Sequence, residues 1–170
     1  QGSGQCCRTG GRRLVRRLST ADAPAAGGPV IGPGCRVLMV GGLGAVGTAL
    51  AREMTGVLGA RVAVIGRRPR AAAVPPDLAS LVYHQADVTD AAALRGAVDA
   101  VAAELGGIDV VLHLARVVDN APLAVKDRSR AAAVLAVKTA GTRALEAALA
   151  GREIRAFVTF SSLAAWFGLA

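Results

Sequence analysis

A glycine-rich turn between an apolar run and a helix-like segment constrains this chain more than any other feature. The apolar run Val37 to Val40 leads into Gly41-Gly42-Leu43-Gly44-Ala45-Val46-Gly47, and apolar residues then recur at helical spacing from Thr48 to Leu58. Such a strand-to-helix turn presents main-chain amides at a helix N-terminus, where they bind a pyrophosphate, and its glycines leave room for the phosphates. The chain holds 21 glycines in 170 residues, so a chance turn is the alternative.

The residues after the next apolar run indicate which dinucleotide is preferred. Arg61 to Ile65 reads as a second buried strand, and Gly66-Arg67-Arg68 follows it. A site for NAD places an acidic residue about 20 positions beyond the glycines, where it binds the ribose 2′-hydroxyl. Arg67 stands there instead, and a guanidinium suits a 2′-phosphate by charge and donor geometry. We therefore expect NADPH, held in part by Arg67 and Arg68. A solvated arginine cluster is the alternative.

Length and composition limit the class of protein. At 170 residues and 53% hydrophobic residues, the chain suffices for one core and is too short for two ordinary domains. Aromatic residues make up only 3%, so the interior must consist of Ala, Val and Leu, as in parallel sheets between closely packed helices. Much of the net charge of +8 comes from arginines before residue 20. No aromatic residues are interleaved with them, so we expect no nucleic-acid partner.

The cysteines, histidines and apolar runs exclude several further classes. Cys6, Cys7 and Cys35 form neither a metal-ligand spacing nor a disulfide framework, and His84 and His113 lie on separate expected strands. We expect no bound metal and a reduced, cytoplasmic setting. The opening residues show no charged segment followed by an apolar stretch, and no apolar run reaches the roughly 18 residues of a membrane span, so we expect no membrane partner.

The order of expected elements predicts the fold class. Residues 1–34 are rich in Gly, Pro, Ala and Arg and are expected to be a basic interdomain linker, in which residues 12–18 suit an exposed or edge strand. Three more strands are expected at Leu81–Gln85, Ile108–Leu114 and Ala156–Ser161. One helix is expected from Asp90 to Leu105, and a second begins at its cap Ser129 and ends at Ala150. This alternation predicts a Rossmann-like, doubly wound parallel α/β sheet, C-terminally incomplete, with about five strands.

Ligands of such sheets bind at the carboxyl ends of the strands, where candidate site residues gather. Asp87 follows the third strand and suits an adenine amino group, with the Val88 amide as a donor beside it. The fourth strand leads to Ala115, which we expect to line the cofactor, and the fifth to Ser162. Lys138 stands out because the chain has 18 arginines and only two lysines, and an ammonium of adjustable pKa suits proton chemistry. A helix-surface charge is the alternative for Lys138.

Several segments together resemble the short-chain dehydrogenase/reductase superfamily, and more narrowly the ketoreductase domain of modular polyketide synthases. The segments are Gly41 to Gly47, Gly66 to Arg68, Ala86 to Asp90, Val134 to Gly141 and Phe157 to Ser162. Residues 11–18 resemble the segment that joins the structural half of this family to its catalytic half. The resemblance implies that residues 35–170 are an NADP-binding catalytic subdomain.

The resemblance also implies an activity and site roles. The expected reaction is NADPH-dependent reduction of a β-ketoacyl thioester on the phosphopantetheine arm of an acyl carrier protein, beside other domains of the same megasynthase. In this family a Tyr protonates the ketone oxygen, a Ser binds that oxygen and a Lys lowers the pKa of the Tyr. Carried over, Ser162 is the serine and Lys138 the lysine. The Tyr falls beyond Ala170, so we expect a ketoreductase truncated before it, inactive by itself.

Two departures from the family keep other interpretations open. Arg116 stands where the family has Gly, and Val40 stands where it has Thr. A catalytically silent ketoreductase domain of the same kind of synthase is therefore one alternative, and an unrelated NADP-binding regulatory module is another. Val118-Asp119-Asn120 resembles the Leu-Asp-Asp signature of one stereochemical class of ketoreductases.

Overall fold

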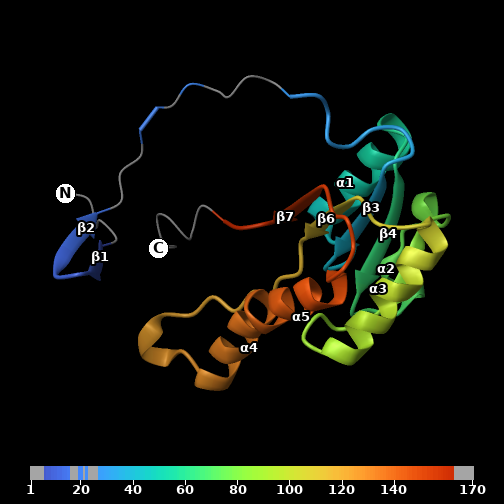
Figure 1. Ribbon diagram of the computed structural model, residues 1–170. Coiled ribbons are helices and arrows are strands. Elements are labelled where there is room, and N and C mark those ends of the chain that lie inside the picture. Colours follow the sequence, from blue (N-terminus) through green and yellow to red (C-terminus); the bar gives the residue numbers. More distant parts are fainter. Residues whose placement is uncertain (1–5, 16–18, 21, 23–26, 163–170) are drawn as a thin grey trace. The chain divides into compact units, whose positions relative to one another are not determined.

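The computed structural model describes residues 6–15, 19–20, 22 and 27–162 (Figure 1). They belong to two compact units, one of residues 1–28 and 161–170 and one of residues 29–160, whose relative positions are not determined. In the first unit, β1 (Cys6–Thr9) and β2 (Arg12–Val15) pair as an antiparallel hairpin. Gly10 and Gly11 both adopt positive φ, which the tight two-residue turn between these strands requires. The strand expected within residues 12–18 is thus present at Arg12–Val15, and residues 16–18 lie outside the described residues.

Five parallel strands form the sheet of the second unit. They are β3 (Arg36–Val40), β4 (Arg61–Gly66), β5 (Val82–Gln85), β6 (Val110–His113) and β7 (Ala156–Thr159). Their spatial order is β5-β4-β3-β6-β7, so the chain starts in the middle, winds to one edge and then continues to the other. This is the doubly wound order of a Rossmann-like α/β fold, and the predicted fold class is confirmed.

Helices cover both faces of this sheet (Figure 1). They are α1 (Ala45–Arg52) with the π-helical turn η1 (Glu53–Val57), α2 (Arg70–Ala73), α3 (Ala91–Leu105), α4 (Arg128–Lys138) and α5 (Ala140–Leu149), with short 3-10 turns at η2 (Pro76–Leu78) and η3 (Leu123–Val125). Because successive strand residues point to opposite faces, Leu38 packs in one core with α3 and α5, and Met39 packs in the other with α1. Both faces are buried, which explains why the strands read as continuous apolar runs.

The ends of α3 and α1 show how far local sequence sets the helix boundaries. The carboxylate of Asp90 accepts hydrogen bonds from the amides of Ala92 and Ala93, and Gly106 ends α3 in the left-handed conformation, so the helix expected from Asp90 to Leu105 is confirmed. The first helix, expected from Thr48, begins three residues earlier, at Ala45. Gly44 is its N-cap, with an extended backbone at φ −79° and ψ −174°.

The single helix expected from Ser129 to Ala150 is wrong in two respects. Its N-cap is Asp127, whose carboxylate accepts from the Arg130 amide, and the helix breaks at Thr139 into α4 and α5. At the break, the hydroxyl of Thr139 bonds the Leu135 carbonyl, and the hydroxyl of Thr142 bonds the Lys138 carbonyl. Such side-chain bonds to the preceding turn compete with the helical ladder and bend it. Lys138 is therefore the last residue of α4.

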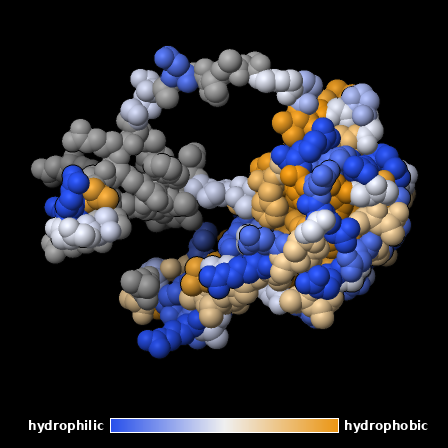
Figure 2. All heavy atoms as spheres, in the orientation of Figure 1, coloured by the Kyte–Doolittle hydropathy of each residue, from blue (hydrophilic) through white to orange (hydrophobic). Residues whose placement is uncertain are grey.

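The surface of the second unit mixes hydrophobic and hydrophilic residues on the face seen in Figure 2. On the outer strand β7, Phe157 and Val158 are 40% and 42% exposed, so this edge is less covered than the central strands β3 and β6. No helix in the described part of the chain is long and apolar enough to span a membrane.

Candidate functional site

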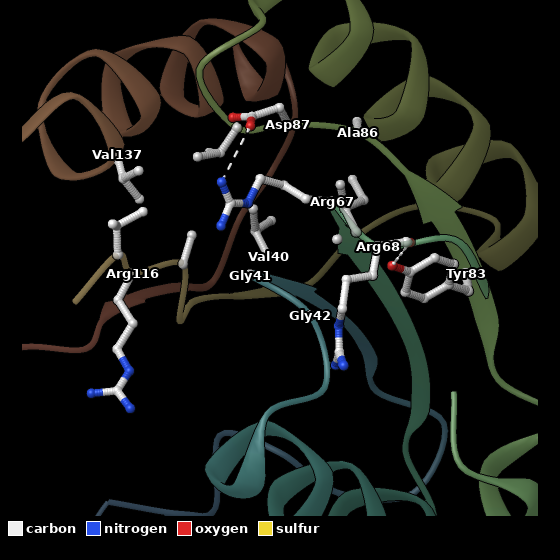
Figure 3. A pocket seen from close by; sticks show the side chains of 15 residues that line it. Val40, Gly41, Gly42, Arg67, Arg68, Tyr83, Ala86, Asp87, Arg116 and Val137 are labelled. Carbon is white, nitrogen blue, oxygen red and sulfur yellow. Dashed lines mark hydrogen bonds and ion pairs between the residues drawn. The ribbon is translucent and has the colours of Figure 1, made fainter. Parts of the chain in front are cut away.

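A pocket opens at the carboxyl edge of the sheet, where the ends of β3, β4, β5 and β6 meet (Figure 3). Its volume is about 640 Å³, which includes space open to solvent. Seven of the twelve expected cofactor residues line it, and they come from four separate segments: Gly41, Gly42, Arg67, Arg68, Asp87, Val88 and Ala115. The other five, Leu43 to Gly47, are not among its lining residues. The fold thus brings together residues that the sequence spreads over some 75 positions, from 41 to 115.

The glycine turn is shaped by close contacts between backbones. Gly41 has a φ of +120°, and a Cβ there would lie 2.1 Å from the amide nitrogen of Ala115. A Cβ on Gly47 would lie 2.6 Å from the carbonyl oxygen of Gly42. The amides of Gly41 and Gly42 both donate to the Ile65 carbonyl, which ties the turn to β4. These positions require glycine for packing, whatever ligand the turn holds.

The start of α1 fits the phosphates of a dinucleotide. The first amides of a helix have no partner within the helix, and no side chain caps them here. A Cβ on Gly44 would meet no atom within 4 Å, so there is open space beside the N-cap of α1. Anions bind favourably at such an end because the helix dipole is positive there. Leu43, Gly44, Ala45 and Val46 therefore stand in a suitable place for a pyrophosphate.

Two arginines leave the end of β4 in different directions (Figure 3). Nη1 of Arg67 lies 3.9 Å from a carboxylate oxygen of Asp87. Nη2 of Arg68 donates to the carbonyl of Leu43 at 3.0 Å, so this side chain reaches the glycine turn. Arg67, Arg68 and Arg116 all line the pocket, which gives its wall three basic residues against the one carboxylate of Asp87. The pocket is therefore suited to a ligand with several phosphate charges.

Asp87 is held in place by its own turn. One carboxylate oxygen accepts from the amide and the hydroxyl of Thr89, at 2.8 and 2.7 Å, and the other faces Arg67. Partial burial acts to raise the pKa of Asp87, but the hydrogen bonds from Thr89 and the Arg67 charge outweigh it, so the pKa is lowered. Asp87 is thus a fixed anionic acceptor. Beside it, Val88 lines the pocket and packs against Gly141 of α5.

Lys138 and His113 meet where α4 ends against β6. Nζ of Lys138 donates to the main-chain carbonyl of His113 at 3.4 Å. Burial lowers the pKa of Lys138. The His113 ring is fully buried, and neither ring nitrogen has a hydrogen-bond partner in the described residues. Burial, reinforced by the charge of Lys138, lowers the pKa of His113, so this ring is held neutral.

Ser162 and Lys138 belong to different units of the chain. It follows β7 and belongs to the unit of residues 1–28 and 161–170, whose position relative to the sheet is not determined. Lys138 belongs to the other unit. The pairing of these two expected catalytic residues stays a prediction.

Three residues on or near the pocket have features that sequence patterns do not reveal. The hydroxyl of Tyr83 and the side-chain amide of Gln85 bond the carbonyls of Arg68 and Arg67. The only sequence signal for them is that residues 83 and 85 share one face of a strand next to β4. Arg116 lines the pocket, and its guanidinium points away from Arg67 and Asp87 (Figure 3).

The loop after β6 is held by ion pairs. Asp119, only 12% exposed, lies 3.0 Å from Nζ of Lys126 and 2.8 Å from a guanidinium nitrogen of Arg130. The main-chain carbonyl of Asp119 also accepts a hydrogen bond from Lys126. The side chain at the centre of the Val118-Asp119-Asn120 signature is therefore engaged within its own loop.

Comparison with protein families finds one model, the KR domain, that matches residues 35–170. Polyketide synthase ThaG of Burkholderia thailandensis is 37% identical over 165 residues, covering 92% of this chain and 3% of that protein. Polyketide synthase GfsA of Streptomyces halstedii is 34% identical over 165 residues, covering 92% of this chain and 2% of that protein. The chain thus spans a small fraction of the length of the curated relatives it matches.

Solved structures share the fold. A short-chain type dehydrogenase/reductase from Mycobacterium ulcerans is 29% identical, with a TM-score of 0.70 over 81% of this chain and 56% of that chain. A ketoreductase domain from the bacillaene assembly line has a TM-score of 0.75 at 22% identity, over 98% of this chain and 41% of that chain. The latter similarity concerns the fold alone.

Proposed function

The chain belongs to the KR domain family, the ketoreductase domains of polyketide synthases, and on that premise we propose that it takes part in NADPH-dependent reduction of a β-ketoacyl thioester. In this proposal the thioester is carried by the phosphopantetheine arm of an acyl carrier protein, and the chain works beside other domains of one megasynthase. Residues 35–170 are the cofactor-binding part, and residues 1–34 link it to a preceding domain.

The observation that carries the proposal is the pocket at the carboxyl edge, which is lined by Gly41 and Gly42, by three arginines and by the fixed carboxylate of Asp87. The uncapped start of α1 follows these two glycines along the chain. The amides from Leu43 to Gly47 bind the pyrophosphate. Arg67 and Arg68 bind the 2′-phosphate, because they directly follow β4 and line the pocket. Asp87 accepts from the adenine amino group, the Val88 amide donates to the ring, and Ala115 lines the far end.

The nicotinamide ring of NADPH supplies hydride to the ketone carbon, and the alkoxide that develops there must be stabilised by fixed donors. Lys138 provides a positive charge fixed to the end of β6. Ser162 binds the carbonyl oxygen. Tyr83 is the one tyrosine in the sequence, and its hydroxyl donates to the main-chain carbonyl of Arg68. We do not assign it the role of proton donor.

Arg116 favours a second candidate function, a catalytically silent ketoreductase domain. Its side chain lines the pocket where the family has Gly, and a bulky cation there hinders a bound nicotinamide ribose unless it turns outward. The side chain turns away from Arg67 and Asp87, the residues proposed for the adenosine end of the cofactor (Figure 3). Family membership excludes the third alternative, an unrelated regulatory module.

Calorimetric titration with NADPH and NADH separates these functions. We expect the chain to bind NADPH more tightly than NADH, and the polypeptide in which the chain occurs to oxidise NADPH when given a β-ketoacyl pantetheine thioester. Binding without reduction by that polypeptide would leave the silent domain. No binding of either dinucleotide would contradict the cofactor site and would also leave the silent domain, in which Arg116 blocks the ribose.

A further inference from the structure

Two side chains of β5 hold the main chain of both pocket arginines. The hydroxyl of Tyr83 donates to the carbonyl of Arg68 at 2.6 Å, and Nε2 of Gln85 donates to the carbonyl of Arg67 at 3.0 Å. Since β5 runs parallel to β4 with Gly66 opposite Gln85, these donors lie beside the residues that leave β4. Two successive carbonyls beyond the end of β4 are therefore tied to the neighbouring strand.

Gly66 makes room for this arrangement. A Cβ on Gly66 would lie 2.7 Å from the hydroxyl oxygen of Tyr83 and 3.1 Å from Cα of Gly42. The tyrosine hydroxyl thus fills the space that a side chain at position 66 would occupy, between β4 and the glycine turn. Burial raises the pKa of Tyr83, so the hydroxyl keeps the proton that it donates to Arg68.

The two tied carbonyls belong to the residues whose side chains diverge. Arg67 turns toward Asp87, and Arg68 turns toward the carbonyl of Leu43. Arg67 is well exposed, with 61% of its side chain accessible, so few contacts of its own fix its direction. The main chain therefore sets the direction in which each arginine side chain leaves it, and β5 holds that main chain in place.

We propose that Tyr83 and Gln85 are positioning residues that hold Arg67 and Arg68 ready for the 2′-phosphate, and so determine the preference for NADPH over NADH. This inference rests on the proposed function, because it needs a dinucleotide in the pocket. Arginines already held in place lose less freedom when they bind a phosphate, and that advantage is gained only by the ligand that carries one. A purely structural role would weaken both dinucleotides alike.

The test compares Tyr83→Phe and Gln85→Met, which remove one donor each and keep the size of the side chain. The dissociation constants of NADPH and NADH are measured for each variant, together with those of adenosine 2′,5′-bisphosphate and AMP, which differ only in the 2′-phosphate. We expect each variant to bind NADPH and the bisphosphate about fivefold more weakly. The values for NADH and AMP should change by less than about twofold.

His84→Gln is the matched control, because His84 lies between the two residues and pairs with Glu104 instead. We expect it to leave the ratio of NADPH to NADH affinity unchanged. A wild-type preference for NADPH that persists in both Tyr83→Phe and Gln85→Met would overturn this inference and leave the proposed function intact. A wild-type chain without any preference for NADPH would overturn both. The ratios compare ligands on one protein, so a partial loss of folded protein does not mimic the effect.

Discussion

The ammonium of Lys138 lies 3.4 Å from the main-chain oxygen of His113, so the last residue of α4 is joined to the last residue of β6. This contact places Lys138 at the carboxyl edge of the sheet, next in sequence to Val137, which lines the pocket. The break between α4 and α5 makes the contact possible, because it ends α4 at Lys138.

Replacing Lys138 by Met should lower kcat for ketone reduction by about 10²- to 10⁴-fold, because the site loses its fixed positive charge. The dissociation constant of NADPH should change far less. Steady-state kinetics of the polypeptide that contains the chain, with titration of NADPH, measure both. Lys126→Met removes the only other lysine, which pairs with Asp119, and should leave kcat close to wild type. Equal losses of kcat in the two variants would contradict the role of Lys138.

The pH dependence of the reaction gives a separate test of Lys138. Burial lowers its pKa, so the ammonium loses its proton at a lower pH than an ordinary lysine does. If the ammonium is the active form, kcat falls as pH rises through this lowered pKa. Lys138→Arg stays protonated throughout, so we expect its alkaline limb to move to higher pH. A wild-type profile that stays flat to the ordinary lysine range, about pH 10, would contradict the argument.

His113 should make the free energy of unfolding depend on pH. Its pKa is lowered in the folded chain by burial and by Lys138, so the unfolded chain takes up a proton on this ring at a higher pH than the folded chain does. Stability from the neutral ring is complete above the unfolded pKa of about 6.5 and is lost as pH falls below it, by up to about 1.4 kcal/mol per pH unit. We would measure the free energy of unfolding in urea between about pH 7.5 and about pH 5. Its dependence on pH should be weaker for His113→Leu than for the wild type.

Sequence patterns could predict some residues of this site and not others. The glycine turn, the strands and the Asp90 cap follow from local rules, because backbone conformation and capping depend on a few adjacent residues. The break at Thr139 does not, because a threonine inside an apolar period is compatible with a continuous helix until its hydroxyl bonds the preceding turn. The contacts of Tyr83 and Gln85 depend on the register between β4 and β5, which no local rule supplies.

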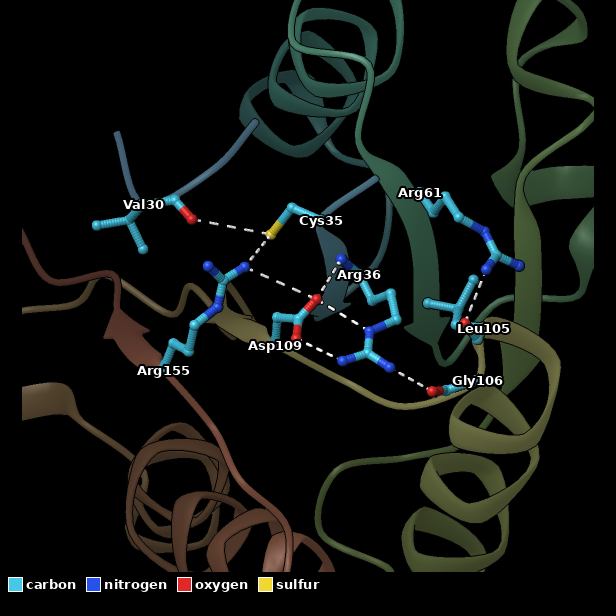
Figure 4. A network of polar contacts seen from close by, with 8 residues as sticks. All are labelled: Val30, Cys35, Arg36, Arg61, Leu105, Gly106, Asp109 and Arg155. Atoms are coloured by element: carbon cyan, nitrogen blue, oxygen red, sulfur yellow. Dashed lines mark hydrogen bonds and ion pairs between the residues drawn. The ribbon is translucent and has the colours of Figure 1, made fainter. Parts of the chain in front are cut away.

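At the opposite edge of the sheet, Asp109 joins the starts of three strands (Figure 4). Its carboxylate accepts from Nε and Nη2 of Arg36, at 2.9 and 2.6 Å, and from the Arg36 amide. Nη2 of Arg155 lies 3.7 Å from the same carboxylate and also donates to the thiol of Cys35. Arg36 reaches on to the carbonyl of Gly106, which ends α3. This network lies far from the pocket and ties β3, β6 and β7 together.

Asp109→Asn should lower the free energy of unfolding by about 1–3 kcal/mol near pH 7, because the guanidinium of Arg36 loses its charged acceptor. The hydrogen bonds from Arg36 hold the pKa of Asp109 well below its usual range. The stability from this carboxylate is therefore present above about pH 4 and is lost as pH falls toward the lowered pKa. Urea unfolding should show that the difference in free energy of unfolding between the wild type and Asp109→Asn becomes smaller below about pH 4. Asp99→Asn breaks an exposed pair with Arg152 and should behave like wild type at both ends of this range.

Substitutions at two glycines of the turn distinguish effects on folding from effects on cofactor binding. Gly41→Ala should lower the free energy of unfolding by more than about 2 kcal/mol, because φ is +120° and the new Cβ would meet the backbone of Ala115. Gly44→Ala meets no atom within 4 Å and should cost about 1 kcal/mol or less as a poorer N-cap. Its methyl group nevertheless stands at the uncapped start of α1, where the phosphates must approach closely.

We therefore expect Gly44→Ala to unfold nearly as wild type does and to bind NADPH about tenfold more weakly. Urea unfolding and calorimetric titration of the same preparations measure the two effects. NADH should lose affinity to the same degree, because it carries the same pyrophosphate, whereas Arg67→Ala should weaken NADPH more than NADH. A Gly44→Ala variant that binds both dinucleotides normally would show that the phosphates do not sit on these amides, and the glycine turn would then serve only the close packing seen at Gly41 and Gly47.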